Sequence, residues 1–504
     1  MRQAVCKRFV SILWRRAILA AAIGSLLLLP AFSSAQEQGK KADRRAQRKQ
    51  AATSRPERTR GEKPAASLEW PPKLPGGVDV VTDSSPELLV KPAHVTLAAG
   101  VEIAKAPPTI DLVYYGGQDA PSKLWSVWGD GSTVGDKYYS AIGDHASPKG
   151  RAQVYEYDAT AKKMRLLVEV TKFLEDSGQL PADMNYTPGK IHSRIDIGPD
   201  GWVYFSTHRG SGRTTTDAYG YQGDWVLRTN PATGKTEVVV AHPIPKHCLP
   251  GSVLDGQRMI FYGTTQFGQD APQKGCWFYA YDVKNGKLLT SAPVGFQRYA
   301  MLSSSTGCVY WMPRSPNSRG GDSEDEESAG GSGKKYDPKT NQITDCPAVQ
   351  DVRACTRETA DGLIYGVGGR STQVMMSVFD VKTEKTKVLG PAAVAGAQYI
   401  TTMDIDPSGR YVYYAAGAHG GGAMDGTPVI QYDTKANKRK VIAFLQEYYS
   451  KKYTYVPDGT FGSALSPDGS TLFVTWNGRR VPTAKEWDTV AMTAIHIPAS
   501  ERQP

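Results

Sequence analysis

The sequence has few cysteines, and after its first 35 residues it has no apolar run long enough to cross a membrane. Six cysteines occur in 504 residues, without a Cys-x-x-Cys-His motif, which excludes covalent attachment of a c-type haem. Gly-x-Ser-x-Gly, the Ser-x-Asp-x-Gly-x-Thr-Trp box of sialidases and a glycine-rich phosphate loop before a helix are also missing. The sequence therefore carries no common catalytic motif.

The first 35 residues have the three parts of a secretory signal peptide. An apolar run at residues 17–29 is followed by small residues that end at Ala35, the expected cleavage site. The cations that precede this run are Arg2, Lys7, Arg8, Arg15 and Arg16. Arg15-Arg16 leaves twin-arginine export open as an alternative to general secretion. We therefore predict a protein that is secreted or periplasmic.

Residues 36–63 lack aromatic side chains and any aliphatic side chain larger than alanine, and hold ten Lys or Arg against four Asp or Glu. Such a segment cannot bury enough apolar surface to order itself. We predict a basic disordered tail and a proline-rich lead-in over residues 36–107. Of the formal net charge of +10, the signal contributes +5 and the tail +6, so the remainder is close to neutral. Bulk charge thus gives no argument for nucleic acid.

One block recurs seven times from Lys123 onward: an inner strand, a glycine-containing turn, an apolar strand, a loop and a third strand. Its signatures are a turn such as Pro199-Asp200-Gly201 before an apolar strand, and an aromatic residue followed by Asp, as in Tyr157-Asp158. A period of roughly 45–55 residues with about four strands per unit is typical of a β-propeller. Radial stacking buries both faces of each sheet.

These repeats predict an all-β fold: a seven-bladed β-propeller of four-stranded blades over residues 108–499, with residues 500–504 as a C-terminal tail. The last block lacks a clear fourth strand, and a spare strand at Thr109–Tyr115 could close the ring in its place. Residues 313–335 are rich in Asp, Glu, Gly and Ser, and predict a flexible acidic insertion in blade four. The chain resembles seven-bladed propellers with degenerate repeats of the WD40-like or YVTN type, which implies the fold and not an activity.

Five cysteines remain after the signal peptide, and in an oxidising compartment some are expected to pair. Cys346 and Cys355 flank the junction of blades four and five, and Cys248 and Cys276 share blade three. An odd count leaves at least one thiol. The alternative for each cysteine is a buried packing residue.

Cationic and imidazole side chains recur at one position of the repeat. Counting eleven residues back from the second strand of each block reaches the start of the inner strand, which in four successive blades holds His192, a nearby His247, Arg298 and Arg353. Just after the second strands come His208, Arg209, Gln266 and His419. Both positions fall at the same end of a blade, so these side chains should meet at one mouth of the central channel.

Three interpretations of this group are open. As an enzyme site, the catalytic residues would be His192, His208, Tyr262 and Arg298, with His or Tyr as general base or acid. The residues that bind a substrate carboxylate or sulfate would be Arg194, Arg209, Gln266 and Arg353. As a metal site for a divalent ion such as Zn, Mn or Ca, the ligands would be His192, His208 and His247. Otherwise these side chains line a wet channel and bond across blades.

The group resembles the active sites of propeller polysaccharide lyases of the ulvan and oligogalacturonate lyase types. The resemblance implies an acidic, uronate-containing glycan as substrate, in some cases with a metal. Arg would neutralise the uronate carboxylate and His or Tyr would remove the C5 proton, roles that His192, His208 and Arg298 could fill. The alternative function is a non-catalytic propeller that binds a glycan, a peptide or a partner protein. We expect a monomer with an extracellular ligand, no nucleic-acid partner and no membrane span.

Overall fold

The computed structural model describes residues 68–119, 125–144, 149–181, 184–314, 331–368, 373–480 and 487–503. The predicted signal peptide, the basic tail up to residue 67 and most of the acidic insertion lie outside these residues. Among the described residues, no helix is both long and apolar enough to cross a membrane.

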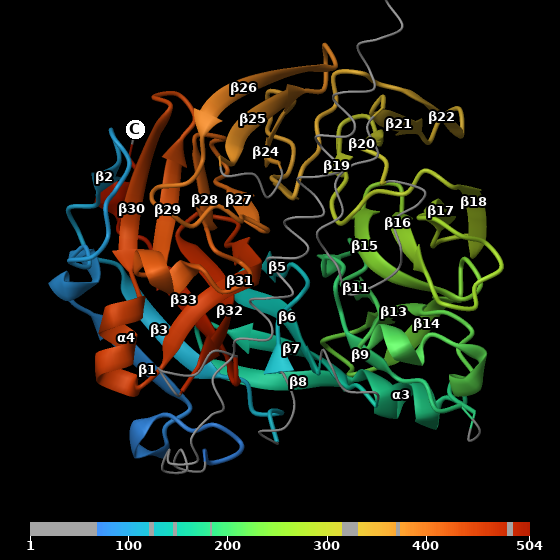
Figure 1. The fold of residues 1–504 in the computed structure, drawn as a ribbon, viewed down its shortest axis with the longest axis horizontal. Helices are drawn as coiled ribbons and strands as arrows, with labels where there is room; N and C mark the ends of the chain where they lie inside the picture. Colours follow the sequence, from blue (N-terminus) through green and yellow to red (C-terminus); the bar gives the residue numbers. More distant parts are fainter. Residues whose placement is uncertain are drawn as a thin grey trace, which may run out of the picture. The chain divides into compact units, whose positions relative to one another are not determined.

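Seven antiparallel sheets surround one axis, which confirms the predicted all-β, seven-bladed propeller (Figure 1). Blade one consists of β4 (Trp125–Ser126), β6 (Lys137–Asp144), β7 (Ala152–Asp158) and β8 (Lys163–Glu169), with β5 (Ser132–Val134) beside β6. Blade two consists of β10 (Asp196–Ile197), β11 (Val203–Ser206), β13 (Trp225–Thr229) and β14 (Thr236–Ala241). Blade three consists of β15 (His247–Asp255), β16 (Ile260–Phe267), β17 (Phe278–Asp282) and β18 (Lys287–Ala292).

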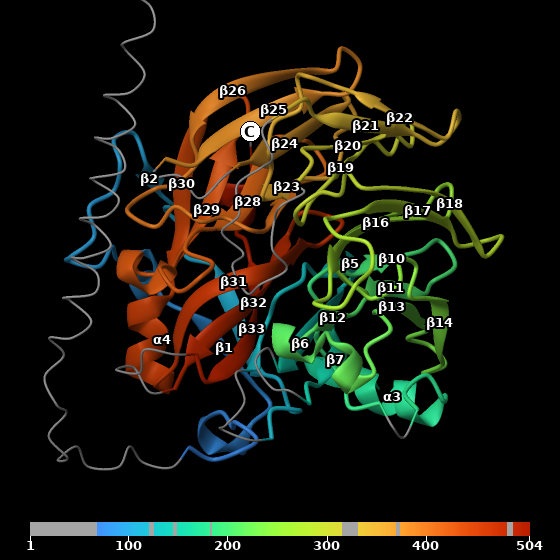
Figure 2. The ribbon, with the colours of Figure 1, turned by 45° about the vertical axis from the view of Figure 1, so that its right-hand side comes forward.

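The remaining blades repeat this order. Blade four consists of β19 (Met301–Leu302), β20 (Val309–Trp311), β21 (Lys334–Asp337) and β22 (Gln342–Asp345). Blade five consists of β23 (Ala354–Cys355), β24 (Leu363–Val367), β25 (Met375–Asp380) and β26 (Lys385–Pro391). Blade six consists of β27 (Met403–Ile405), β28 (Tyr411–Ala415), β29 (Pro428–Asp433) and β30 (Lys438–Phe444). Blade seven begins with β31 (Val456–Leu465), β32 (Thr471–Arg479) and β33 (Thr489–His496), which lie beside blade six in Figure 2.

Short elements join the blades. Two α-helices follow outer strands: α3 (Val170–Asp176) and α4 (Gln446–Tyr453). A two-stranded ladder joins β9 (Pro188–Lys190) to β12 (His208–Arg209). The 3-10 turns are η1 (Pro75–Gly77), η2 (Pro86–Leu89), η3 (Gly212–Thr214), η4 (Asp217–Tyr219), η5 (Gly422–Asp425) and η6 (Ala499–Glu501).

The ring is closed by an N-terminal strand, as predicted. Strand β3 (Thr109–Tyr114) pairs antiparallel with β33 as the fourth strand of blade seven, from Thr109 opposite His496 to Tyr114 opposite Ala491. The described part of the lead-in also forms strands: β1 (Val80–Ser84) pairs with β3, and β2 (Glu102–Ile103) runs parallel to β30. The lead-in thus covers the outer edges of blades six and seven, which would otherwise expose unpaired backbone groups.

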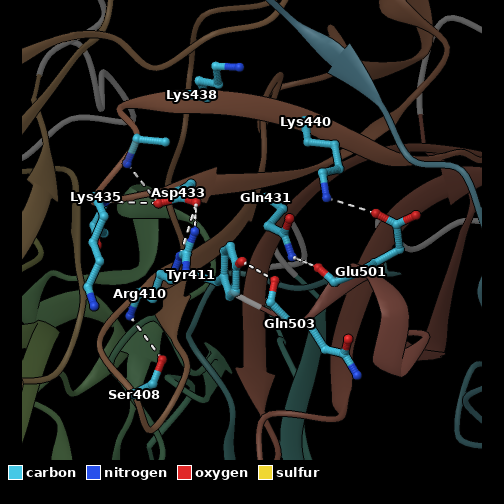
Figure 3. Close-up of polar contacts among 12 residues, drawn as sticks. Ser408, Arg410, Tyr411, Gln431, Asp433, Lys435, Lys438, Lys440, Glu501 and Gln503 are labelled. Atoms are coloured by element: carbon cyan, nitrogen blue, oxygen red, sulfur yellow. Dashed lines mark hydrogen bonds and ion pairs between the residues drawn. The ribbon is translucent and has the colours of Figure 1, made fainter.

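The C-terminal residues bind blade six (Figure 3). The Gln431 side-chain amide donates to the Glu501 carbonyl at 2.8 Å, and the Tyr411 hydroxyl donates to the Gln503 carbonyl at 2.7 Å (Figure 3). The Glu501 carboxylate accepts from Lys440 at 2.7 Å and from two backbone N–H groups of the lead-in, at residues 105 and 106. Burial opposes ionisation of Glu501, but these bonds outweigh it and lower its pKa. Residues from both ends of the propeller are therefore tied to one blade.

The hydrophobic core is divided among the interfaces between neighbouring blades. Phe278 of blade three stacks on Trp311 of blade four with ring centroids 4.4 Å apart. Tyr138 of blade one stacks on Phe473 of blade seven at 5.2 Å. Burying one such side chain is worth roughly 1.5–3 kcal/mol. The aromatic residues of the repeat therefore hold adjacent blades together.

The described residues include five cysteines, which are all buried free thiols, and no disulfide joins them. This corrects the predicted pairs, Cys346 with Cys355 and Cys248 with Cys276. The Cys248 thiol donates to the Gln266 carbonyl at 3.3 Å, across β15 and β16. Burial raises the pKa of both Cys248 and Cys355 to about 12, so both remain protonated at neutral pH.

Candidate functional site

The inner strands line the channel in layers, because side chains two residues apart point to the same side of a strand. The layer nearest the start of the strands includes Trp128, His192, Arg298, Arg353 and Phe461. Two residues further on come Asp130, Arg194, Ala300, Cys355 and Ser463, and two further Ser132, Asp196, Leu302 and Arg357. The blades approach closely here: a Cβ added at Gly129 would lie 2.2 Å from the Ser193 carbonyl oxygen. Only glycine fits at that position.

Aromatic rings and cations meet at the end of the channel where the inner strands begin. We call this group the upper cluster; its members are Trp128, Lys190, His192, His208, Arg298, Arg353, Tyr399, His419, Phe461 and Trp487. The Trp128 ring is its centre, with ring centroids 4.8 Å from Phe461, 5.7 Å from His419 and 6.2 Å from Trp487. The Lys190 Nζ lies 4.5 Å from the same ring, a cation–π distance.

Two imidazoles lie side by side in this cluster. The His192 and His208 ring centroids are 5.3 Å apart, and His192 also stacks on Trp128 at 6.2 Å with 13° between the planes. The ladder of β9 and β12 places His208 opposite Lys190. The His192 Nδ1 lies 2.7 Å from the Pro250 carbonyl oxygen. Because a carbonyl only accepts hydrogen bonds, Nδ1 carries the proton and the neutral ring has its lone pair on Nε2.

Two arginines extend the cluster across the next blades. The Arg298 Nη2 donates to the Phe461 carbonyl at 2.8 Å, and its guanidinium lies over the Phe461 ring at 4.8 Å. Its buried Nη1 has no hydrogen-bond partner among the described residues. The Arg353 Nη1 donates to the Tyr399 hydroxyl at 3.2 Å, and the Tyr399 ring stacks on His419 at 4.9 Å. The cluster therefore presents positive charge beside ring faces.

Arg209 and Gln266 form a pair next to His208. The Arg209 Nη2 donates to the Gln266 side-chain oxygen at 3.2 Å. A buried carboxylate, Asp224, lies near Arg209 and accepts from the Thr207 hydroxyl at 2.7 Å. Burial raises the pKa of Asp224 to about 6, against the opposing effects of its hydroxyl donors and of Arg209.

His247 does not join the other two imidazoles. Its Nδ1 lies 2.7 Å from the Thr265 hydroxyl and its Nε2 lies 2.9 Å from the Gln273 carbonyl, both within blade three. Burial lowers the pKa of His247 to about 4. Among the residues that the structure describes, no group of three or more His, Cys, Asp or Glu could hold a metal ion. The three-histidine metal site predicted from His192, His208 and His247 is thus not assembled.

Two other predicted site residues lie away from the upper cluster. The Tyr262 hydroxyl donates to the Gly307 carbonyl at 3.2 Å, and its ring packs against Tyr336 at 5.6 Å in the core between blades three and four. Burial raises the pKa of Tyr262, which makes it a poor base. Arg194 lies two residues deeper in the channel than His192 and lines a cavity at the opposite end. Tyr262 therefore faces a neighbouring blade, and Arg194 lies too deep in the channel to join the cluster.

The aromatic members of the cluster were missed from the sequence. Counting eleven residues back from Tyr139, in the second strand of blade one, reaches Trp128. The same count in blade seven reaches Phe461. The recurrence of an aromatic residue at this position of the repeat is the signal that predicts Trp128 and Phe461 at the mouth of the channel.

A hydrogen-bonded layer separates the two ends of the channel. The Tyr299 hydroxyl lies 2.5 Å from the buried Asp130 carboxylate, which also accepts from Thr402. The Thr402 and Ser463 hydroxyls are 2.7 Å apart, and Ser463 donates to Asp404 at 2.5 Å. Burial raises the pKa of Asp130 and brings that of Asp404 to about 6.

Comparisons with known proteins give similar solved structures at low sequence identity. No family model and no curated protein match the sequence. One similar solved structure is the β-propeller domain of the Trilobed protease from Pyrococcus furiosus, with 12% identity, 74% of this chain and 93% of that chain covered, and a TM-score of 0.42. Another is an oligogalacturonate lyase in complex with manganese, which is 12% identical in sequence. The alignment covers 81% of this chain and 98% of that chain, and the TM-score is 0.46. A third is the oligogalacturonate lyase from Vibrio parahaemolyticus, which is 9% identical in sequence. The alignment covers 81% of this chain and 98% of that chain, and the TM-score is 0.44.

Proposed function

We propose that this protein is a secreted or periplasmic, monomeric propeller that binds an acidic, uronate-containing polysaccharide at the upper cluster and cleaves it by β-elimination. The observation that carries the proposal is His192. Its ring is held by the Pro250 carbonyl in the tautomer with the basic nitrogen at Nε2, beside a second imidazole and among cations. A base oriented by a fixed hydrogen bond is what proton abstraction needs.

The cations account for the choice of an acidic substrate. A uronate carboxylate near Lys190, Arg298 and Arg353 would have its charge neutralised, which makes the neighbouring C5 proton more acidic. The Trp487 ring, which is partly exposed, offers apolar surface of the kind on which a sugar ring packs.

In the proposed reaction, His192 Nε2 takes the C5 proton. The electrons of the C5–H bond form a C4–C5 double bond, and the C4–O bond breaks with its electrons on the leaving glycosidic oxygen. Protonated His208 donates a proton to that oxygen. The products are a shortened chain and a chain that ends in an unsaturated uronate.

The second candidate is a non-catalytic propeller that binds an acidic glycan, peptide or protein at the same cluster. It is favoured by the aromatic content of the site and by the position of Tyr262, which removes the predicted catalytic tyrosine from the cluster. Cations and ring faces bind an anion whether or not a bond is broken.

The experiment combines a binding assay and a reaction assay. Purified protein is titrated with polygalacturonate by calorimetry, and the ultraviolet absorbance of unsaturated uronate is followed in the same mixture. His192→Ala and His208→Ala are compared with His94→Ala, a matched control at an exposed histidine. Absorbance that rises with the wild type and the control, but not with His192→Ala, supports the lyase. Binding without absorbance supports the second candidate, and no binding contradicts both.

A further inference from the structure

A cavity of about 600 Å³ lies at the end of the channel opposite to the upper cluster. Its walls come from the ends of inner strands and from turns of blades one to five, and none of its lining residues belongs to the upper cluster. We call it the lower cavity; the lining residues that matter here are Arg194, Asp196, Asp255, Leu302, Arg357 and Glu358.

The carboxylates of the lower cavity are already satisfied by the protein. Asp255 forms an ion pair with Arg258 at 2.9 Å, and Glu358 accepts from the Ser305 hydroxyl at 2.7 Å. Asp196 accepts a backbone N–H of the next blade at 2.9 Å. Burial opposes ionisation of Glu358, yet the bonds from Ser305 and its neighbours lower its pKa. These acids therefore have partners that do not depend on a ligand.

The two arginines of the cavity are different. Arg194 forms an ion pair of 3.8 Å with Asp196, longer than a hydrogen bond, and also interacts electrostatically with the buried Asp130. Its buried Nε has no hydrogen-bond partner among the described residues. Arg357 is exposed, and its Nη2 donates to the Ser132 hydroxyl at 3.3 Å. A guanidinium carries five N–H donors in a planar fork. The cavity thus holds more donors than its own acceptors use.

One part of the wall is apolar, with Val253, Leu254, Ala300 and Leu302 among its lining residues. The volume lies in the range of about 300–1,000 Å³ that is typical of small-molecule sites. We propose that the lower cavity binds a small organic carboxylate, with its anionic group on Arg194 and Arg357 and its apolar body against this wall. The site is separate from the upper cluster, so the ligand need not be the polysaccharide.

The test uses benzoate as the probe and benzamide, which has the same shape without the charge, as the matched ligand. Binding to the full chain is measured by ligand-observed NMR titration. We expect saturable binding of benzoate, about ten-fold or more weaker binding of benzamide, and about ten-fold or more weaker binding of benzoate to Arg194→Gln and to Arg357→Gln. The control variant is Arg410→Gln, because Arg410 pairs with Asp433 on blade six outside the cavity (Figure 3).

Three results would overturn the proposal. One is the absence of saturable benzoate binding to the wild type. Another is unchanged affinity in Arg357→Gln, which is expected to fold because Arg357 is exposed. The third is loss of benzoate binding in His208→Ala, which would place the probe at the upper cluster.

Discussion

The upper cluster and the lower cavity lie at the two ends of one channel and are built by the same inner strands, yet their chemistry differs. At the upper end, the guanidinium of Arg298 lies over an aromatic ring and that of Arg353 bonds a tyrosine hydroxyl, around Trp128. At the lower end, Arg194 and Arg357 face apolar side chains and satisfied carboxylates. Two to four residues along a strand, about 7–13 Å, thus separate two distinct surfaces. The buried layer of Asp130 and its hydroxyl partners keeps them apart.

The sharpest test of this separation is a pair of substitutions with opposite effects. His192→Ala is expected to lower the β-elimination rate by about 10²–10⁴-fold, the usual contribution of a general base, and to leave benzoate binding unchanged. Arg357→Gln is expected to weaken benzoate binding and leave the elimination rate unchanged. Rates are measured with polygalacturonate and affinities by NMR titration. If either variant changes both quantities, the two ends are not independent.

Trp128→Ala tests the centre of the upper cluster. The side chain is 5% exposed and contacts rings from blades two, six and seven. We expect the free energy of unfolding to fall by about 3–5 kcal/mol, as for other buried large-to-small substitutions. Trp277→Ala, at a partly exposed tryptophan of blade three, is the control and should cost much less. Urea denaturation measures both, and equal losses would contradict the central role of Trp128.

Replacing Asp224, the buried carboxyl near Arg209, tests whether its pKa is raised in the folded protein. Its pKa is raised to about 6 in the fold, above about 3.9 in the unfolded chain, so the folded state binds the extra proton between these values. The stability from this group is therefore present at low pH and is lost as the pH rises through about 6. Relative to Asp224→Asn, the wild type should lose roughly 1–3 kcal/mol between pH 4 and pH 7. Denaturation curves at both pH values measure this difference, and a constant difference would contradict the raised pKa.

Glu501→Gln weakens the contacts that tie the C-terminal residues to the lead-in and to blade six, away from both ends of the channel. Loss of the charge weakens the bonds to Lys440 and to the lead-in, and we expect a cost of about 1–2 kcal/mol. Glu447→Gln, in the exposed pair with Lys451, should cost about 0–1 kcal/mol. Thermal unfolding compares the two. Elimination rate and benzoate affinity should stay the same in both variants, and a change in only one of them would show that closure acts on that end.

The seven blades could be predicted from the sequence because strands and turns depend on residues that are close together along the chain. Alternating apolar residues and Asp-Gly or Ser-Gly turns specify hairpins wherever they occur, and seven repeats of them predict a propeller. The closing role of residues 109–115 followed from counting strands. The strands of the lead-in were not predicted. The prolines around β1 and β2 are typical of irregular structure, and the two short segments form strands only because they pair with blades six and seven.

The sequence by itself determined the all-β architecture, the seven blades, the strand that closes the ring and the end of the channel at which His192 and His208 meet. Only the tertiary structure decided that His247 bonds within blade three, that Tyr262 packs between blades three and four, that Arg194 belongs to the opposite end, and that the cysteines stay apart. The physical reason is the range of the interactions. Strands and turns follow from neighbours along the chain, whereas the direction of a side chain in a channel depends on how closely seven separate blades pack around one axis.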